Sequence, residues 1–325
     1  MRLSPRLIVV AALTVLVGGS AAGCSGNSGT AMASSKARRP AAITASVPPG
    51  TRSQANTAAA PSIRVVGAPQ GVLAKGGILA DAATGQVLWK RDPDTERPMA
   101  SITKVMTAYL VIQAGNLNRK IKVPAGVLNY VQKYGASSDG LTPGQTLTAH
   151  ELLEGLLIES GADAAYTLAN AYGPGMGAFV AKMNATARKM GMLHTHFASP
   201  DGLPYPTEYS TYSTPSDLLI LGKAAMKSQV FRQIVNQGSY SLPKGHGHSA
   251  YLWTNDNELI GSYPGAVGIK TGFTDDAGHC LLFEAVRHGR PLIGVVLGSP
   301  VTGPGAAAQD AAHVLNWGFS LKQSS

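Results

Sequence analysis

The chain has 325 residues, and its 27 Lys and Arg against 18 Asp and Glu give a formal net charge of +9. Nucleic acid is a possible partner for a basic protein. Here, however, the basic residues are scattered rather than interleaved with aromatic residues, so we expect no nucleic-acid binding. An anionic cell wall fits the charge better.

Residues 1–23 have the pattern of an export signal. Arg2 and Arg6 supply positive charge, and residues 7–17 form an apolar run that is too short to span a bilayer. The following Ala21-Ala22-Gly23-Cys24 resembles the lipobox of bacterial lipoproteins, so we predict lipidation of Cys24 and a lipid-anchored protein outside the cytoplasm. The alternative is cleavage after the small residues before Cys24, which would release a secreted protein. A lipid on Cys24 would leave Cys280 without a disulfide partner.

Residues 24–73 are predicted to form a flexible tether. From Ser25 to Leu73 the chain is rich in Ser, Ala, Thr, Pro and Gly and has no aromatic residue, so it can bury little apolar area. Residues 74–325 are long enough for one domain, which could have two lobes. We expect this domain to be a monomer.

The predicted domain begins with strands and a helix. Two apolar runs at residues 77–81 and 87–90 indicate a β-hairpin. Apolar residues at helical spacing predict a helix over residues 100–114, ended by Gly115.

The middle of the domain is predicted to be helical and its end to return to strands. A capping box formed by Thr148 and Glu151 opens a helical region over residues 150–172, another helix ends at Gly191, and a third begins at Thr214 and Pro215. Apolar runs at 266–271, 280–286 and 291–297 predict strands, and residues 306–319 predict a last helix. This order indicates an antiparallel sheet flanked by helices, with an inserted helical lobe.

Ser101 and Lys104 are the first candidate catalytic residues. Residues three apart at the start of a helix share a face, so the hydroxyl and amine groups can meet. A lysine of ordinary pKa is protonated at neutral pH, and a second cation could remove that proton. At an effective dielectric of about 20, a unit charge ~4 Å away costs roughly 4 kcal/mol, or about three pKa units. Lys270 is the candidate for that cation.

A lone Ser-x-x-Lys is weak evidence, because the chain contains a second copy at Ser241 and Lys244. Proline inside that copy argues against a helix there. The first copy is followed in order by Ser160-Gly161-Ala162 and by Lys270-Thr271-Gly272. The three elements together are a strong signal.

With these motifs the chain resembles the serine-type D-alanyl-D-alanine carboxypeptidases, the low-molecular-mass penicillin-binding proteins. Stretches such as Asp163-Ala164-Ala165 and Pro200-Asp201-Gly202-Leu203 are also similar to that family. The resemblance implies an α/β fold of the α+β type: a penicillin-binding or β-lactamase-like transpeptidase fold with a five-stranded antiparallel sheet and an all-helical lobe. It also implies cleavage of the terminal D-Ala of peptidoglycan stem pentapeptides, inhibition by β-lactams, and a part in peptidoglycan biosynthesis and cell shape.

The resemblance assigns a role to each motif. Ser101 would attack the penultimate D-Ala and form an acyl-enzyme, with Lys104 as the base and Ser160 as a proton relay. The terminal carboxylate would be held by Lys270 and Thr271. The remaining roles fall on the next two residues: Gly272 would let the peptide approach the strand, and the Phe273 amide would join the Ser101 amide in the oxyanion hole.

Ala162 departs from the family pattern, which usually has asparagine at this position. Alanine cannot hydrogen-bond to the catalytic lysine or the substrate amide, and Asp163 need not point inward. Three alternatives to a carboxypeptidase therefore stay open: a DD-transpeptidase with weak hydrolysis, a catalytically degenerate wall-binding lipoprotein, and, less well supported, a β-lactamase.

No metal and no organic cofactor is predicted. Two closely spaced histidine pairs occur, at His194 and His196 and at His246 and His248, but no cysteine or carboxylate beside them completes a ligand set. Cys280 lies in an apolar strand, where a thiol is more often a packing group than a nucleophile.

Overall fold

The computed structural model describes residues 63–301, 303 and 305–322. The predicted signal peptide, the Cys24 lipidation site and most of the predicted tether lie outside these residues. Within the described ranges, no helix is both long enough and apolar enough to cross a membrane.

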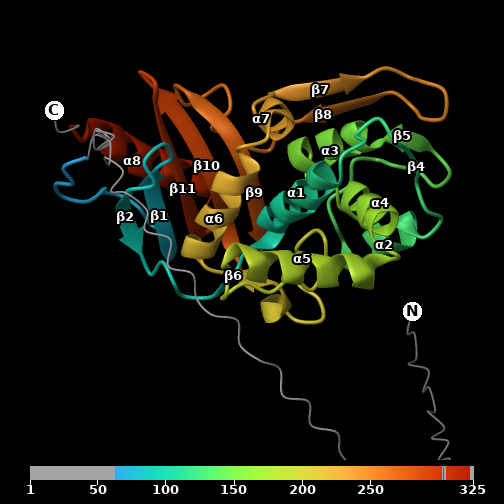
Figure 1. The fold of residues 1–325 in the computed structure, drawn as a ribbon, viewed down its shortest axis with the longest axis horizontal. Helices are drawn as coiled ribbons and strands as arrows, with labels where there is room; N and C mark the ends of the chain where they lie inside the picture. The colour runs from blue at the N-terminus through green and yellow to red at the C-terminus, as the bar shows by residue number, and fades with distance from the viewer. Residues whose placement is uncertain (1–62, 302, 304, 323–325) are drawn as a thin grey trace, which may run out of the picture. The chain divides into compact units, whose positions relative to one another are not determined.

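A five-stranded antiparallel sheet forms one side of the domain (Figure 1). Its strand order is β2-β1-β11-β10-β9, so the first hairpin lies beside the last strand and β9 lies at an edge. The predicted hairpin and the three predicted late strands are confirmed, and His288 and Gly289 form the last turn with positive φ angles. The strands are β1 (Gly76–Asp81), β2 (Val87–Arg91), β9 (Ala266–Thr274), β10 (Gly278–Arg287) and β11 (Arg290–Ser299).

Each face of the sheet is covered by helices. Because side chains alternate along a strand, Ile78 and Leu282 pack into one core, whereas Leu79 and Leu281 pack into another on the opposite face. Helix α6 contacts β1, β10 and β11 on the first side, and α8 contacts the same strands on the second. These helices are α6 (Pro215–Ala225) and α8 (Ala306–Ser320).

The helical lobe lies beside the sheet in Figure 1, and α1 (Lys104–Ala114) is its central helix. Helix α1 contacts α3, α4, α5, α6 and α7, and its Val105, Met106 and Val111 are fully buried. The other lobe helices are α2 (Val127–Tyr134), α3 (Ala149–Ile158), α4 (Ala162–Tyr172), α5 (Met176–Met190) and α7 (Gln229–Val235). The predicted α+β architecture with an inserted helical lobe is therefore confirmed.

Short strands and turns join these elements. They are β3 (Arg97–Pro98) paired with β6 (Tyr212–Ser213), β4 (Lys120–Lys122) paired with β5 (Thr146–Thr148), and the 3-10 turn η2 (Glu208–Ser210). The predicted helix ends are also in place. Thr214 caps α6 by accepting a hydrogen bond from the Asp217 amide, and Gly191 ends α5 with a φ of 84°.

The helix predicted over residues 100–114 begins differently from expectation. Residues Ala100–Thr103 form the 3-10 turn η1, and α1 (Lys104–Ala114) starts only at the lysine. Ala100 has a φ of +48°, a conformation that an α-helix does not allow. The apolar spacing is the same in both conformations, so the sequence pattern could not distinguish them.

The helical region predicted over residues 150–172 is broken in two. The capping box at its start is confirmed: the Thr148 hydroxyl accepts from the Glu151 amide, and the Glu151 carboxylate accepts from the Thr148 amide. The break falls between α3 and α4, where Ser160 adopts a left-handed φ of +68°. Such a residue cannot continue a right-handed helix.

A hairpin that the sequence analysis did not predict contains the second Ser-x-x-Lys. Its strands are β7 (Ser239–Leu242) and β8 (Tyr251–Thr254). Ser241 lies on β7, so this copy is not helical, as the proline inside it indicated. Stacked aromatic rings, with centroids 6.0 Å apart for Tyr240 and Trp253, stabilise the pair.

Residues 63–73, expected to be the end of the flexible tether, pack against the domain. Ile63 and Val72 are buried in the core below α8. The Leu73 amide donates to the Asp310 carboxylate at 2.6 Å, and the Trp317 ring nitrogen donates to the Val66 carbonyl at 3.3 Å. The expected boundary at residue 73 is therefore too late, because a few well-placed apolar residues and backbone hydrogen bonds are enough to fix this segment.

Candidate active site

Ser101 lies on the η1 turn at one side of a cavity of about 630 Å³. The side chains of Met99 and Ile102 are fully buried, which pins the turn in the core and leaves Ser101 half-buried at the cavity wall. Lys104 Nζ donates a hydrogen bond to Ser101 Oγ at 2.7 Å. The two residues predicted to meet therefore do so, although the turn between them is 3-10 rather than α.

The surroundings of Lys104 favour its neutral form. The side chain is 1% exposed, and burial lowers the pKa of the Lys104 amine. Nearby carboxylates oppose this shift, with Asp201 the largest of them, and the Asp201 carbonyl also accepts from Nζ at 3.3 Å. The net direction is downward, so the amine is a better base than a solvated lysine.

Lys270 lies on β9 and is as deeply buried as Lys104, at 1% exposed. Burial and, second, the charge of Lys104 lower the pKa of Lys270 to about 7. Its Nζ donates to Thr271 Oγ1 at 3.2 Å. The charge of Lys270 was expected to remove the Lys104 proton. Burial, however, is the largest cause of the lowered pKa in both lysines.

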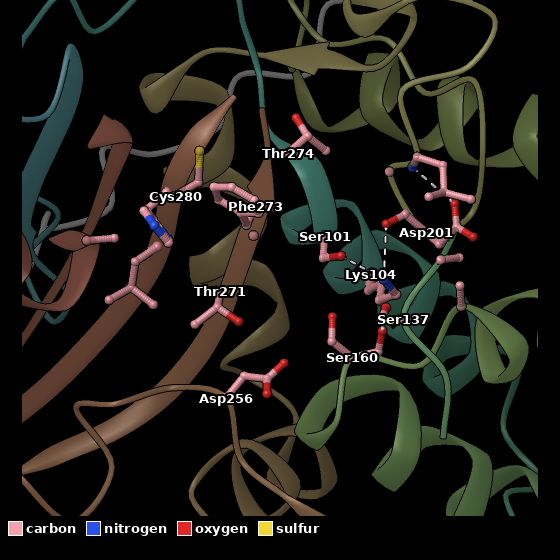
Figure 2. A pocket seen from close by; sticks show the side chains of 18 of the residues that line it. Ser101, Lys104, Ser137, Ser160, Asp201, Asp256, Thr271, Phe273, Thr274 and Cys280 are labelled. Carbon is pink, nitrogen blue, oxygen red and sulfur yellow. Dashed lines mark hydrogen bonds between the residues drawn. The ribbon is translucent and has the colours of Figure 1, made fainter. Parts of the chain in front are cut away.

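The edge strand β9 forms the opposite wall of the cavity. Figure 2 shows Thr271 and Phe273 facing Ser101 and Lys104 across the opening. Phe273 is 47% exposed and packs against the His279 ring, with centroids 4.6 Å apart. Among the described residues β9 pairs only with β10, so its outer edge is free to pair with an extended peptide.

The close neighbour of Gly272 in the structure is the turn that carries Ser101, whereas the sequence analysis expected a bound peptide. A Cβ at this position would lie 2.8 Å from the Met99 carbonyl and 3.0 Å from the Ser101 amide nitrogen. The missing side chain therefore lets β9 approach the turn that carries Ser101. Gly202 has the same function on another side, since its Cβ would lie 2.0 Å from the Ala100 carbonyl.

Ser160 lies in the bend between α3 and α4, on the same side of the cavity as Ser101 (Figure 2). It is 6% exposed and lines the cavity together with Ala162. Its carbonyl accepts from the Ser137 hydroxyl, and the Ser137 carbonyl accepts from the Ala162 amide. The bend is thus hydrogen-bonded to the loop after α2 on both sides of Gly161.

Asp163 does not replace the missing asparagine. Its carboxylate accepts from the Ser138 hydroxyl at 2.7 Å, the Asp139 amide at 2.9 Å and the Leu141 amide at 3.0 Å. It therefore ties the loop after α2 to the start of α4 and points away from the substrate space. This agrees with the expectation that it need not point inward.

Several residues at the site received no role from the sequence analysis. Asp201 contacts Lys104 through its carbonyl, and its carboxylate accepts from the Tyr130 hydroxyl at 2.8 Å. Ser137 and Asp139 lie next to the Ser160 bend. A signal existed only for Asp201, which belongs to a stretch that resembles the family.

The remaining candidates are the histidine pairs and Cys280, of which Cys280 lines the cavity. Over the part of the chain that the structure describes, no cluster of three or more His, Cys, Asp or Glu side chains could hold a metal ion. His196 Nδ1 donates to the Ser210 carbonyl at 2.7 Å, and His194 Nδ1 lies 3.3 Å from the Glu96 carboxylate. Cys280 is a buried free thiol, and burial raises its pKa to about 11. A thiol with this pKa is a poor nucleophile.

Comparison with known proteins gives a consistent result. The profile of peptidase family S11, described as D-alanyl-D-alanine carboxypeptidase, matches residues 63–301. The chain is 38% identical to a D-alanyl-D-alanine carboxypeptidase of Streptomyces sp. strain K15 over 262 residues, which is 77% of this chain and 88% of that protein. It is 40% identical to D-alanyl-D-alanine carboxypeptidase DacB2 of Mycobacterium tuberculosis over 245 residues, 75% and 81% of the two chains. The crystal structure of the Streptomyces K15 DD-transpeptidase superimposes with a TM-score of 0.73 at 38% identity, covering 79% of this chain and 100% of that chain.

Proposed function

This chain belongs to the D-alanyl-D-alanine carboxypeptidase family and is a serine DD-peptidase, and we propose that Ser101 is the nucleophile with which it cleaves the terminal D-Ala of peptidoglycan stem peptides. One observation carries the assignment. The Lys104 amine lies 2.7 Å from the Ser101 hydroxyl in surroundings that favour the neutral amine. A hydroxyl beside a neutral, buried amine is an activated nucleophile.

Acylation uses both walls of the cavity. Neutral Lys104 takes the Ser101 proton while Oγ attacks the carbonyl carbon of the penultimate D-Ala. The negative charge on the carbonyl oxygen is stabilised by the amides of Ser101 and Phe273, where one lost donor costs about 3 to 4 kcal/mol. The close approach at Gly272 supports this pairing, because it brings β9 against the Ser101 turn. The C–N bond then breaks, and the proton that Lys104 took from Ser101 passes through Ser160 to the nitrogen of the leaving D-Ala.

The terminal carboxylate of the substrate binds at Lys270 and Thr271. The Lys270 ammonium already donates to the Thr271 hydroxyl, which orients both groups on β9. A bound carboxylate favours the charged lysine and raises its pKa, which offsets the effect of burial. Binding and protonation of Lys270 are therefore coupled, and binding weakens as the pH rises above about 7.

The acyl-enzyme on Ser101 is resolved by water or by an amine. Water gives a carboxypeptidase, in which the ester bond breaks and the Ser101 hydroxyl is restored. An amine from a second peptide gives a transpeptidase. Transfer is the second candidate because the relative from Streptomyces K15 is named both a carboxypeptidase and a DD-transpeptidase.

β-Lactams are expected to acylate Ser101 and to leave slowly, since they imitate the D-Ala-D-Ala end. A catalytically degenerate wall-binding protein would have no reason to keep the hydrogen bond between Ser101 and Lys104 or the burial of both lysines. A β-lactamase would need a group that activates water against the acyl-enzyme, and none was found in the sequence.

A peptidase of this family acts on the cell wall, so the protein works outside the cytoplasm. We keep the proposal that a lipid on Cys24 anchors it to the membrane. The mass of the N-terminal peptide from membrane fractions tests this: a diacylglyceryl adduct on Cys24 supports the anchor. An unmodified mature protein that starts after Ala22 would favour secretion.

The function is tested by D-alanine release from a peptide ending in D-Ala-D-Ala. Parent protein should release D-alanine, and Ser101→Ala should release none above background. Adding glycine as an amine acceptor separates the two outcomes: transfer gives a glycine-terminated peptide, whereas hydrolysis gives the shortened acid. Release by Ser101→Ala at the parent rate would refute the assignment of the nucleophile.

A further inference from the structure

Asp139 is a buried acid behind the Ser160 bend with no assigned role. It is 5% exposed, and its backbone is fixed at both ends: its amide donates to Asp163 at 2.9 Å, and its carbonyl accepts from the Trp253 ring nitrogen at 3.0 Å. Both carboxyl oxygens are buried, and neither has a hydrogen-bond partner among the described residues. A polar group left in this condition costs stability, so its presence requires an explanation.

The carboxyl group of Asp139 fills a recess walled by two glycines. A Cβ on Gly155 would lie 2.4 Å from a carboxyl oxygen, and a Cβ on Gly161 would lie 1.9 Å from the same oxygen and 2.2 Å from the other. Gly155 is on α3, and Gly161 directly follows Ser160. The side chain therefore packs on the backbone of the bend that holds Ser160.

That bend requires support because Ser160 has a φ of +68°, which is unfavourable for a residue with a side chain. The Ser137 hydroxyl holds the Ser160 carbonyl from the cavity side. Asp139 packs against Gly161 in the recess, out of the cavity. Ala162, which follows Gly161, has no polar side chain that could support the bend.

Burial favours the uncharged form of Asp139, and the charged groups around it act in both directions. Asp163 on α4 and Glu159 after α3 repel a negative charge, whereas Lys104 on α1 and Lys270 on β9 attract one. Burial is the largest influence and Asp163 the second, so the pKa of the Asp139 carboxyl is raised well above its ordinary value. The inference about Asp139 therefore rests on the shape and packing of its carboxyl group.

We propose that Asp139 is a positioning residue for the reaction of Ser101, because its carboxyl group fills the glycine-walled recess and fixes Ser160 in the cavity. Ala162 has no polar side chain that could fix Ser160 instead. The inference rests on the proposed function, since its effect is measured through acylation of Ser101.

The test measures acylation by benzylpenicillin over a range of concentrations, which separates the limiting rate from the half-saturating concentration. Asp139→Ala empties the recess and should lower the limiting rate at least ~10-fold while changing the half-saturating concentration less than ~3-fold. Asp139→Asn keeps the shape without a charge and should stay within ~3-fold of the parent, with the same pH profile from pH 5.5 to 9. Circular dichroism and thermal unfolding verify that each variant is folded.

A double-mutant cycle shows whether Asp139 acts through Ser160. In a Ser160→Ala background, adding Asp139→Ala should lower the limiting rate less than ~2-fold further. An Asp139→Ala rate equal to the parent, a full additional loss in the Ser160→Ala background, or a shifted acid limb in Asp139→Asn would each overturn the inference. If Asp139→Ala does not fold, a shifted acid limb in the pH profile of Asp139→Asn would still overturn the inference. Absence of any acylation of the parent would instead refute the proposed function.

Discussion

The turn that carries Ser101 and the bend that carries Ser160 face the same cavity but are held in different ways. The Ser101 turn is held by close backbone contacts, since Gly202 and Gly272 allow two neighbouring segments to approach it where a side chain would not fit. The Ser160 bend is held by hydrogen bonds to polar side chains, chiefly those of buried Asp163 and exposed Ser137. Asp139 packs as closely on Gly155 and Gly161, so both regions should be sensitive to added atoms, whereas the Ser160 bend should also be sensitive to removed hydrogen bonds.

The largest effect is expected from removing the polar support of the Ser160 bend. Asp163→Ala leaves the buried amides of Asp139 and Leu141 without an acceptor. Hydrogen bonds to a charged group are worth about 1.5 to 3 kcal/mol each, so the free energy of unfolding should fall by roughly 3 to 6 kcal/mol. Chemical denaturation measures this free energy of unfolding.

Ser138→Ala is the matched control for this change. It removes one donor to the same carboxylate, but Ser138 is exposed and can be replaced by water. A loss of about 1 kcal/mol or less is expected. Equal losses in the two variants would contradict the account of Asp163 as the centre of the polar support.

The second prediction adds one methyl group to the Ser101 side. In Gly202→Ala the new Cβ would lie 2.0 Å from the Ala100 carbonyl, at a φ of 86°. Backbone strain of about 1 kcal/mol and overpacking of about 1 to 3 kcal/mol should together lower the free energy of unfolding by roughly 2 to 4 kcal/mol.

Gly144→Ala has a nearly identical φ of 87° but open space around the new methyl group. It should therefore lose only the strain of about 1 kcal/mol and should be acylated like the parent. Similar losses at both glycines would show that the backbone angle alone matters and that the close approach to the Ser101 turn does not.

The third prediction concerns pH and the two buried lysines. Because the pKa of Lys270 is about 7 in the folded protein and near 10.5 when unfolded, the unfolded state binds more protons between these values. The free energy of unfolding should therefore rise with pH from about 7 to 10, by up to about 1.4 kcal/mol per unit for this residue. Denaturation at pH 7, 8 and 9 measures the slope.

Lys270→Met should make this slope shallower without removing it, because the pKa of Lys104 is also lowered by burial. Exposed Lys244→Met should keep the parent slope. If Lys270→Met kept the full slope as well, Lys270 would not be held in an unfavourable charged state.

The smallest expected effect comes from one hydroxyl group behind Lys104. Tyr130→Phe removes the hydrogen bond to Asp201, whose carbonyl contacts the Lys104 amine. A loss of about 1 kcal/mol corresponds to roughly 5-fold slower acylation. Tyr166→Phe is the control, since its ring packs on Tyr130 but its hydroxyl makes no hydrogen bond within the described residues. A similar slowing in both variants would point to packing.

The sequence indicated Ser101, Lys104 and Lys270 better than the residues that support the Ser160 bend. Ser101 and Lys104 are close in the chain, so their meeting depends on a single turn, and Lys270 follows them in a recognisable order. Asp139 and Ser137 contact a bend more than 20 residues away, and no local spacing encodes that contact. The left-handed conformation of Ser160 is likewise a product of its surroundings, because serine has no intrinsic preference for it.

Prediction of the fold from the sequence was limited in the same way. Continuous apolar runs predicted the strands of the sheet because its central strands are buried on both faces, and apolar residues at helical spacing predicted most helices because each helix buries one face. The packing of residues 63–73 rests on few apolar side chains, such as Ile63 and Val72, and on backbone hydrogen bonds. Composition alone therefore indicated a tether where the structure has an ordered segment.

Intact-mass spectrometry of the protein after incubation with benzylpenicillin tests the central claim most directly, with Ser101→Ala beside the parent. We predict one added penicilloyl mass on the parent alone, which peptide mapping places on Ser101. No adduct on the folded parent at high drug concentration, or an equal adduct on Ser101→Ala, would contradict the assignment of Ser101 as the nucleophile.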